Sequence, residues 1–263
     1  MRADTTLDLL AAIGRAVIGL CRGTGRLAVF GLNGISCIVR PPFYPRLFGQ
    51  ALLEIGYFSL PVVALTAIFT GMVLALQTYT GFSRFNAESA VASVVVLSLT
   101  RELGPVLAGL MVSGRVGAAM AAELGTMRVT DQIDALSTLS TDPMKYLVAP
   151  RILAAIIALP ALVIVADILG VLGGFIVSTA KLGFNASTYL TNTMNIVQAQ
   201  DVWSGLVKAA VFGFLIALMG CYQGYNSRGG AQGVGAATTV AVVSASILIL
   251  AVDYVLTEMF FAQ

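Results

Sequence analysis

Apolar residues form five long stretches along the chain, separated by shorter polar segments. Each stretch can cross about 30 Å of hydrocarbon, which takes roughly 20 residues of α-helix at about 1.5 Å per residue. We therefore predict an all-α integral membrane protein, a single membrane domain over residues 1–263 with five transmembrane helices. The predicted helices cover residues 52–79, 89–112, 148–180, 203–224 and 237–261.

Closely spaced glycines occur in the third and fourth of these stretches. The third stretch is longer than a membrane crossing needs, so it is expected to tilt, extend beyond the bilayer or break near Gly170, Gly173 and Gly174. The pairs Gly170–Gly174 and Gly220–Gly224 also have the G-x-x-x-G spacing that lets two helices approach closely. Glycine is common in membrane helices, so this spacing is a weak signal.

Residues 5–38 are predicted to form an interfacial amphipathic helix rather than a sixth span. Arg15, Arg22 and Arg26 fall within about 40° of one another at about 100° per residue. The apolar residues that point broadly the other way are Leu10, Ile13, Val17, Leu20 and Leu27. A basic amphipathic helix lies in the membrane interface. The alternative is a disordered basic arm, and Pro41, Pro42 and Pro45 end either one.

The amino-acid composition supports a membrane protein and argues against several functional classes. The chain is 58% apolar and 11% charged, with mean hydropathy +0.91 and net charge +2, so a basic surface for nucleic acid is not expected. Histidine is absent, and Cys21, Cys37 and Cys221 form no C-x-x-C pair. We predict no catalytic residue, no metal site and no resident cofactor. The acids near the start make a removable signal peptide unexpected.

Lys and Arg residues are unevenly divided between the two sets of loops. Eleven fall in the N-terminal segment and the second and fourth loops, against Arg84, Lys181 and, near a membrane edge, Lys208 in the others. Basic loops stay in the cytoplasm. The N-terminus is therefore predicted to be cytoplasmic and the C-terminus to lie outside. The eleven are Arg2, Arg15, Arg22, Arg26, Arg40, Arg46, Arg115, Arg128, Lys145, Arg151 and Arg228.

The second stretch carries two charges at its centre. Arg101 and Glu102 stand within "VLSLTRELGPVLAGLMVSGRVG", followed by Gly104 and Pro105. On insertion scales the two charges cost about 5–7 kcal/mol, whereas the Val and Leu residues of the span return about 3–7 kcal/mol. The helix therefore needs protein or water on one side. Pro105 has no N–H for the carbonyl of Arg101, so a kink is expected.

Arg101 and Glu102 point about 100° apart on a helix, so each is expected to have its own partner. The other acids in or beside the spans are candidates for Arg101: Glu54, Asp167 and Asp253. Two interpretations remain open. The charges form an ion-paired brace inside the protein, or they form the polar wall of a cavity for an amphiphilic substrate.

The segment between the second and third spans is too long for a simple helix hairpin. Two short helices are predicted in it, one with Thr130 as N-cap and Asp131 in its first turn, the other capped by Asp142 with Pro143 at its first position. The first helix would offer Met127, Ile133 and Leu136, flanked by Glu123, Arg128 and Asp134, as a docking surface. A solvated connector is the alternative.

Several motifs resemble the MlaE family, the permease subunits of ABC-type lipid transporters that work with MCE proteins. The most specific is "TRELGPVLAGLMVSGRVGAAMAAELGTMRVTDQIDAL" at residues 100–136. The others are "FTGMVLALQ" at 69–77, "DPMKYLVAPRILA" at 142–154, "GVGAATTVAVV" at 233–243 and "LAVDYVLT" at 250–257. The resemblance extends over most of the chain.

This resemblance implies a homodimer in the bacterial inner membrane with a phospholipid bound between the copies. It implies ABC ATPase subunits that bind ATP and Mg and dock on a coupling segment at residues 114–139, an outer ring of MCE subunits, and room for a small STAS-type accessory subunit. The implied lipid-cavity residues are Thr70, Leu74, Gln77, Arg101, Glu102, Gly104 and Pro105. The coupling residues are Glu123, Leu124, Met127, Arg128, Ile133, Asp134 and Leu136.

Two features agree with such a division of labour. The chain has no G-x-x-x-x-G-K-[ST] phosphate loop, so ATP hydrolysis is expected to belong to another polypeptide. The predicted outer loops, about 80–88 and 181–202, are too small to shield a lipid tail from water. The alternatives are an ion-coupled secondary transporter that uses Glu102, Asp167 and Asp253 as a proton relay, and an intramembrane lipid enzyme with Glu102 as acid or base.

Overall fold

The structure is a computed structural model that describes residues 2–85 and 90–261. Every regular element in the described residues is helical, as predicted. The α-helices are α1 (Arg2–Val39), α2 (Pro45–Ile55), α3 (Leu60–Phe82), α4 (Val91–Ser98), α5 (Gly104–Val112), α6 (Ala118–Val129), α7 (Gln132–Thr138), α8 (Ala149–Ala180), α9 (Ala186–Ile196), α10 (Ala199–Tyr225) and α11 (Gly230–Phe261). Short 3₁₀ turns are η1 (Tyr57–Ser59) and η2 (Ser83–Phe85), and π-helical turns are η4 (Leu99–Leu103), η5 (Ser113–Gly117) and η6 (Met144–Val148).

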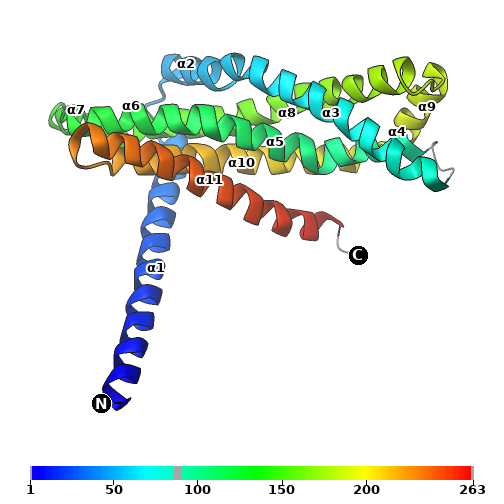
Figure 1. Cartoon of the computed structure of the whole chain (residues 1–263). Helices are drawn as coiled ribbons and strands as arrows, with labels where there is room; N and C mark the ends of the chain where they lie inside the picture. The colour runs from blue at the N-terminus through cyan, green and yellow to red at the C-terminus, as the bar shows by residue number, and fades with distance from the viewer. Residues whose placement is uncertain (1, 86–89, 262–263) are drawn as a thin grey trace.

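Five helical segments of the described residues are long and apolar enough to cross a membrane, which confirms the predicted number. They run side by side along the long direction of the bundle (Figure 1). The segments are Pro45–Phe82, Val91–Val129, Met144–Ala180, Ala199–Tyr225 and Gly230–Phe261. All are longer than predicted. In the second and third segments π turns join shorter helices into a continuous one, and in the first segment the 3₁₀ turn η1 does so. The second span runs through η5 into α6, so the first part of the coupling segment continues a transmembrane helix.

The N-terminal helix α1 runs across the long direction of the bundle and leaves it near the end where α2 begins (Figure 1). If the bundle crosses the membrane, this helix lies along the membrane plane. Arg15, Arg22 and Arg26 are exposed on it, while Gly31 and Gly34 near its end pack against side chains of α10 and α8. The helix predicted for residues 5–38 is thus present, and its place in the membrane interface stays a prediction.

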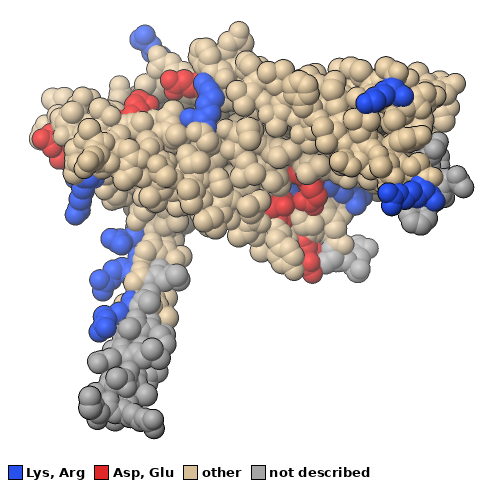
Figure 2. All heavy atoms as spheres, viewed as in Figure 1, with Lys and Arg blue, Asp and Glu red and all other residues tan. Residues whose placement is uncertain are grey.

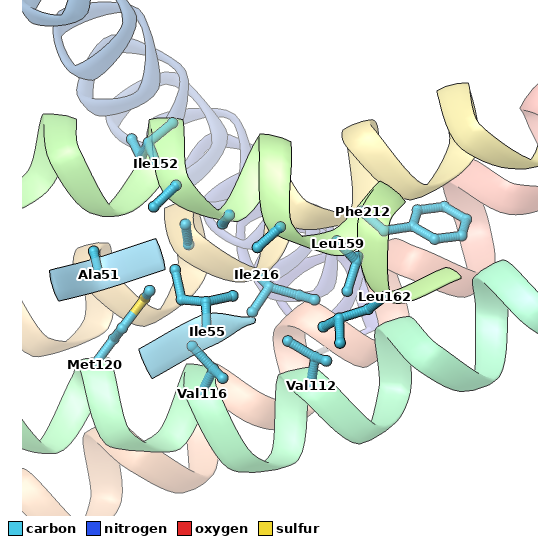
Figure 3. Close-up of a cluster of buried hydrophobic side chains, with 14 of the residues drawn as sticks. Ala51, Ile55, Val112, Val116, Met120, Ile152, Leu159, Leu162, Phe212 and Ile216 are labelled. Atoms are coloured by element: carbon cyan, nitrogen blue, oxygen red, sulfur yellow. The ribbon is translucent and has the colours of Figure 1, made fainter. Parts of the chain in front are cut away.

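A continuous apolar core fills the space between α2, the second span, α8 and α10 (Figure 3). Ile55, Val116, Ile152, Leu159 and Ile216 come from these four segments and are buried. In a membrane such contacts stabilise by close packing rather than by exclusion of water, because lipid tails are as apolar as these side chains. The core therefore depends on shape as much as on hydrophobicity.

Helices α3 and α8 approach so closely that glycines are required at the contact. A Cβ added to Gly71 would overlap the carbonyl of Gly170, and one added to Gly173 would overlap the carbonyl of Ile68. The close packing predicted for Gly170–Gly174 is thus confirmed, and a Cβ at Gly224 would likewise meet α6. Of the three alternatives predicted for this stretch, tilt, extension or a break, the break does not occur, because α8 remains helical from Ala149 to Ala180.

On the face seen in Figure 2, the surface between the two ends of the bundle carries few charged atoms, as a lipid-facing surface requires. Acidic atoms do lie along the part of α11 that diverges from the bundle (Figures 1 and 2). Of the five spans, α11 is the least buried and α10 the most. Helix α9, which sequence analysis took for a loop, packs Tyr189 into the bundle and is capped by the Asn185 side chain.

Candidate functional site

The π turn η4 holds the two charged residues of the second span. The amide of Gly104 donates to the carbonyl oxygen of Leu99, five residues back. Pro105 comes next and has no N–H, so it cannot bond a carbonyl of the preceding turn. The chain stays helical on both sides, and the wider π turn accommodates the proline. The turn lies about 15 Å from the start of α4, roughly half the thickness of the hydrocarbon core.

Lys208 of α10 is the centre of the cluster, and its side chain is fully buried (0% exposed). Its Nζ donates to the carbonyl oxygen of Arg101 at 3.1 Å and to Oε2 of Glu102 at 2.8 Å. It also donates to Oγ1 of Thr257 at 2.7 Å and lies 3.0 Å from Oδ1 of Asp253. One ammonium group therefore joins the π turn to α11. A buried charge is tolerated only with such partners.

Sequence analysis placed Lys208 near a membrane edge, which the structure corrects. The residue sits about 14 Å into α10, at the depth of the charged π turn. The signal was present, since Lys208 lies inside the predicted span 203–224 and an ionisable residue within a span is usually functional. Its proximity to the start of the predicted span concealed its depth.

Arg101 pairs with Asp201, a residue that sequence analysis had assigned to an outer loop. Both Nε and Nη2 of Arg101 lie 2.7 Å from Oδ1 of Asp201. The other carboxylate oxygen of Asp201, Oδ2, accepts a hydrogen bond of 2.9 Å from the backbone N–H of Gln198, the N-cap residue of α10. The guanidinium carbon of Arg101 also lies 4.5 Å from the ring centroid of Phe261, which fits a cation–π contact.

The three acids predicted as partners of Arg101 lie elsewhere, so that prediction is wrong. Asp253 contacts Lys208 instead. Asp167 is packed against Gly104, and its Oδ1 has no hydrogen-bond partner among the described residues. Glu54 is exposed on α2, where its backbone carbonyl accepts a hydrogen bond from Arg115. The separate partners predicted for Arg101 and Glu102 are confirmed.

Among the described residues, the expected lipid-cavity residues are divided between two places. Thr70 and Gly104 line a small cavity of about 10 Å³ between α3, α5 and α8. Arg101 and Glu102 belong instead to the cluster with α10 and α11. The two sets lie on different sides of the second span.

The remaining expected cavity residues differ in burial. Leu74 packs partly buried against the apolar cluster formed with α4, whereas Gln77 is exposed. Pro105 is buried against α10, where a Cβ at Gly205 would lie 3.4 Å from its Cγ. Pro105 therefore shapes the helix contact rather than a surface open to ligand.

Two of the expected coupling residues are not available for docking. Leu124 is fully buried and Ile133 is 1% exposed, both within the main core, and Met127 and Leu136 pack against that core. Ile133 is therefore not part of the exposed docking surface predicted for this segment, and Leu124, implied as a coupling residue by the resemblance, is not exposed to a partner either. A large apolar side chain that is exposed in this segment is Leu139, the residue after α7, at 74% exposure.

The charged coupling residues are paired with one another or with neighbouring elements. Arg128 lies 2.6 Å from Asp134, and Glu123 lies 2.6 Å from Arg151 at the start of α8. Arg128, Asp134 and Arg228 also line an open polar hollow of about 290 Å³ between the α6–α7 turn and the α10–α11 turn. This end of the bundle therefore presents a hollow with charged walls.

The caps of this segment are partly as predicted. Thr130 is not an N-cap, since it ends α6 and its hydroxyl donates to the carbonyl of Thr126 at 2.8 Å. Asp131 occupies the cap position of α7 in the left-handed region, with φ 57°. The Asp142 cap is confirmed, because its carboxylate accepts the amide of Met144 at 2.9 Å.

Five apolar spans and an ionic cluster between the second span, α10 and α11 define a multi-pass membrane protein. The chain belongs to the MlaE permease family, whose sequence profile, Permease MlaE, matches residues 48–259. It is 60% identical over 255 residues to a probable ABC transporter permease protein of Rickettsia bellii, covering 97% of this chain and 98% of the relative.

Two relatives of lower sequence identity come from other groups of organisms, and the name of one states its transport system. The intermembrane phospholipid transport system permease protein MlaE of Haemophilus influenzae is 35% identical over 259 residues, covering 97% of this chain and 98% of that one. The chloroplastic protein TRIGALACTOSYLDIACYLGLYCEROL 1 of Arabidopsis thaliana is 37% identical over 212 residues, 81% of this chain and 61% of that one. The family assignment thus holds across bacterial and plant proteins.

Proposed function

We propose that this chain is the permease subunit of an ATP-driven phospholipid transporter, in which two copies enclose a lipid-binding cavity. The observation that carries the proposal is the exposure of the ionic cluster. In the single chain the side chains of Arg101 and Glu102 are 36% and 37% exposed, although they lie inside a membrane span, about 15 Å from its start. The full-length similarity to a phospholipid transport permease supports the same conclusion.

The exposed side chains of Arg101 and Glu102 need polar or protein surroundings rather than lipid tails. A charge at the bilayer centre costs roughly 2.5–3.5 kcal/mol on insertion scales, even with local rearrangement. A second copy packed beside the sparsely buried α11 would enclose Arg101 and Glu102 in a shared cavity. A phospholipid headgroup offers both a phosphate for Arg101 and polar groups for Glu102, so the cavity suits an amphiphilic substrate.

The energy would come from ABC ATPase subunits that bind ATP and Mg and dock at the end of the bundle formed by α6 and α7. The charged hollow beside Arg128 and Arg228, with exposed Leu139 nearby, offers polar and apolar contacts for such a partner. Closure of the ATPases would push the two coupling segments together and change the shape of the cavity. The permease itself would hydrolyse nothing.

The proposed location is the bacterial inner membrane, with a cytoplasmic N-terminus and a periplasmic C-terminus, from the distribution of Lys and Arg. Lipid would be exchanged on the periplasmic side with a ring of MCE-domain subunits, and a small STAS-type subunit would accompany the ATPase. The system would maintain lipid asymmetry or lipid supply of the outer membrane.

The test is ATP-dependent lipid transfer in reconstituted vesicles by the chain co-expressed with its ATPase. Leu139→Asp should abolish ATPase co-purification and transfer, since it places a charge on the exposed apolar contact. Leu190→Asp, at an exposed position of α9 at the other end of the bundle, is the matched control and should retain both. Lipid transfer driven by a proton gradient without any ATPase would contradict the proposal.

A further inference from the structure

A second cavity lies away from the ionic cluster, where the end of α1, the turn into α2 and the start of α8 meet. It is partly open and has a volume of about 190 Å³. Its walls are mostly apolar and include Ile38, Phe43, Phe48, Pro150 and Leu153. A concave apolar site with a few polar groups is the usual form of a ligand pocket.

The position of the cavity corresponds to the edge of the membrane. Helix α1 runs across the bundle, and the spans α2–α3 and α8 start beside its end (Figure 1). Tyr44 lines the cavity and stacks edge-on against Tyr146, with ring centroids 5.2 Å apart. Tyrosines gather where hydrocarbon meets headgroups. The cavity is therefore reached from the headgroup region of the leaflet beside α1.

The rim of the cavity is predominantly basic. Lys145 lines it and donates from Nζ to the carbonyl oxygen of Pro41 at 3.2 Å. Arg40 is exposed next to this turn. The acid nearby, Asp142, already accepts the amide of Met144. The pKa of Cys37, which lines the cavity, is raised by burial and by Asp142, while Lys145 and Arg40 act in the opposite direction.

We propose that this cavity binds an anionic phospholipid of the leaflet beside α1, with an acyl chain against the apolar walls and the phosphate near Lys145 and Arg40. An apolar pocket with basic residues at the membrane edge matches both parts of such a lipid. This lipid is distinct from a transported one, since the cavity shares no residue with the ionic cluster. It would fix the angle between α1 and the bundle.

The full chain supplies its own probe, because Cys37 lines the cavity and Cys21 is exposed on the same helix outside it. The chain is reconstituted in vesicles of phosphatidylcholine, with or without phosphatidylglycerol, and alkylated with a soluble maleimide. Phosphatidylglycerol should slow alkylation of Cys37 relative to Cys21 about fivefold, as expected for one basic residue acting on an anionic lipid. Because membrane surface charge affects both thiols, the ratio of the Cys37 to the Cys21 alkylation rate cancels that effect.

Substitution of the basic rim tests the charge requirement. Lys145→Glu should abolish this protection and reduce the phosphatidylglycerol retained by the purified chain in native mass spectrometry. Arg40→Glu, at an exposed position, should do the same without removing the contact between Lys145 and Pro41. Lys181→Glu, exposed at the far end of α8, is the matched control and should leave both measurements unchanged.

Three outcomes would overturn the inference. The first is equal Cys37 alkylation in the two kinds of vesicle. The second is protection that survives both Lys145→Glu and Arg40→Glu. The third is loss of retained lipid in Lys181→Glu to the same extent as in Lys145→Glu, which would mean that lipid binds by net charge alone.

Discussion

The ammonium group of Lys208 donates a hydrogen bond to the backbone carbonyl of Arg101, 3.1 Å away, four residues before a proline that has no N–H to offer. The same group contacts Glu102 and Asp253. Lys208 thus combines two tasks that are usually separate, because it completes the hydrogen bonding of a helix and neutralises two partly exposed acids. The charged π turn and α11 are held together through this one side chain.

Replacing Lys208 with Met, a side chain of similar length, should destabilise the protein by about 3–5 kcal/mol, because Glu102 and Asp253 lose their buried counter-ion. Thermal unfolding in detergent can be followed with a thiol-reactive dye in a Cys21→Ser, Cys37→Ser background, since the remaining Cys221 is fully buried until the bundle opens. Lys181→Met at an exposed position is the control and should unfold like the wild type. Equal midpoints for the two variants would contradict a structural role for Lys208.

Arg101 and Asp201 are expected to act as one unit. Arg101→Gln and Asp201→Asn should each reduce lipid transfer, and the double variant should lose little more than either single one, because both break the same 2.7 Å ion pair. The coupling free energy should be about 1–3 kcal/mol in a double-mutant cycle on stability. Strictly additive losses would mean that the two residues serve different purposes.

The close contact between α3 and α8 predicts that no side chain larger than that of glycine fits at Gly71. Gly71→Ala should destabilise the bundle by about 1–3 kcal/mol or prevent assembly, since the new Cβ would overlap the Gly170 carbonyl. Gly81→Ala on the same helix has open space around it and should be neutral or slightly stabilising. Unfolding in denaturing detergent distinguishes the two. A tolerated Gly71→Ala would refute the close approach.

Replacement of an apolar residue by Asp in the coupling segment should affect stability differently at a buried and at an exposed position. Ile133→Asp should lower stability by several kcal/mol, on the order of 3–5, because it buries an unpaired carboxylate in the core. Leu139→Asp should leave the unfolding temperature unchanged, because that side chain is exposed. Thermal unfolding of both variants without any ATPase separates folding from docking. Similar unfolding temperatures would contradict the burial of Ile133.

The sequence predicts the fold well because membrane insertion depends on hydropathy summed over about 20 residues. The five spans, the N-terminal helix and the Asp142 cap all follow from local pattern. The isolated charges at Arg101 and Glu102 correctly marked the cluster, since an ionisable group within a span needs a specific environment.

The partners within the cluster could not be predicted in the same way. Asp201 lies 100 residues from Arg101, and Lys208 lies 106 residues from Glu102, so their pairing depends on how α10 packs beside the second span. The burial of Ile133 has a similar cause. A short helix with apolar residues on one face can dock inward or outward, and only the neighbouring helices decide which.

Where α3 and α8 meet, peptide groups touch peptide groups, with no side chain between them that could change rotamer. Such a joint cannot slide by small adjustments, so the two helices must travel together as one rigid body. Any opening and closing of the molecule then has its pivot elsewhere. The hydrogen bonds and ion pairs between α10 and α11 can break singly and re-form, and the moving edge of the protein is to be sought there.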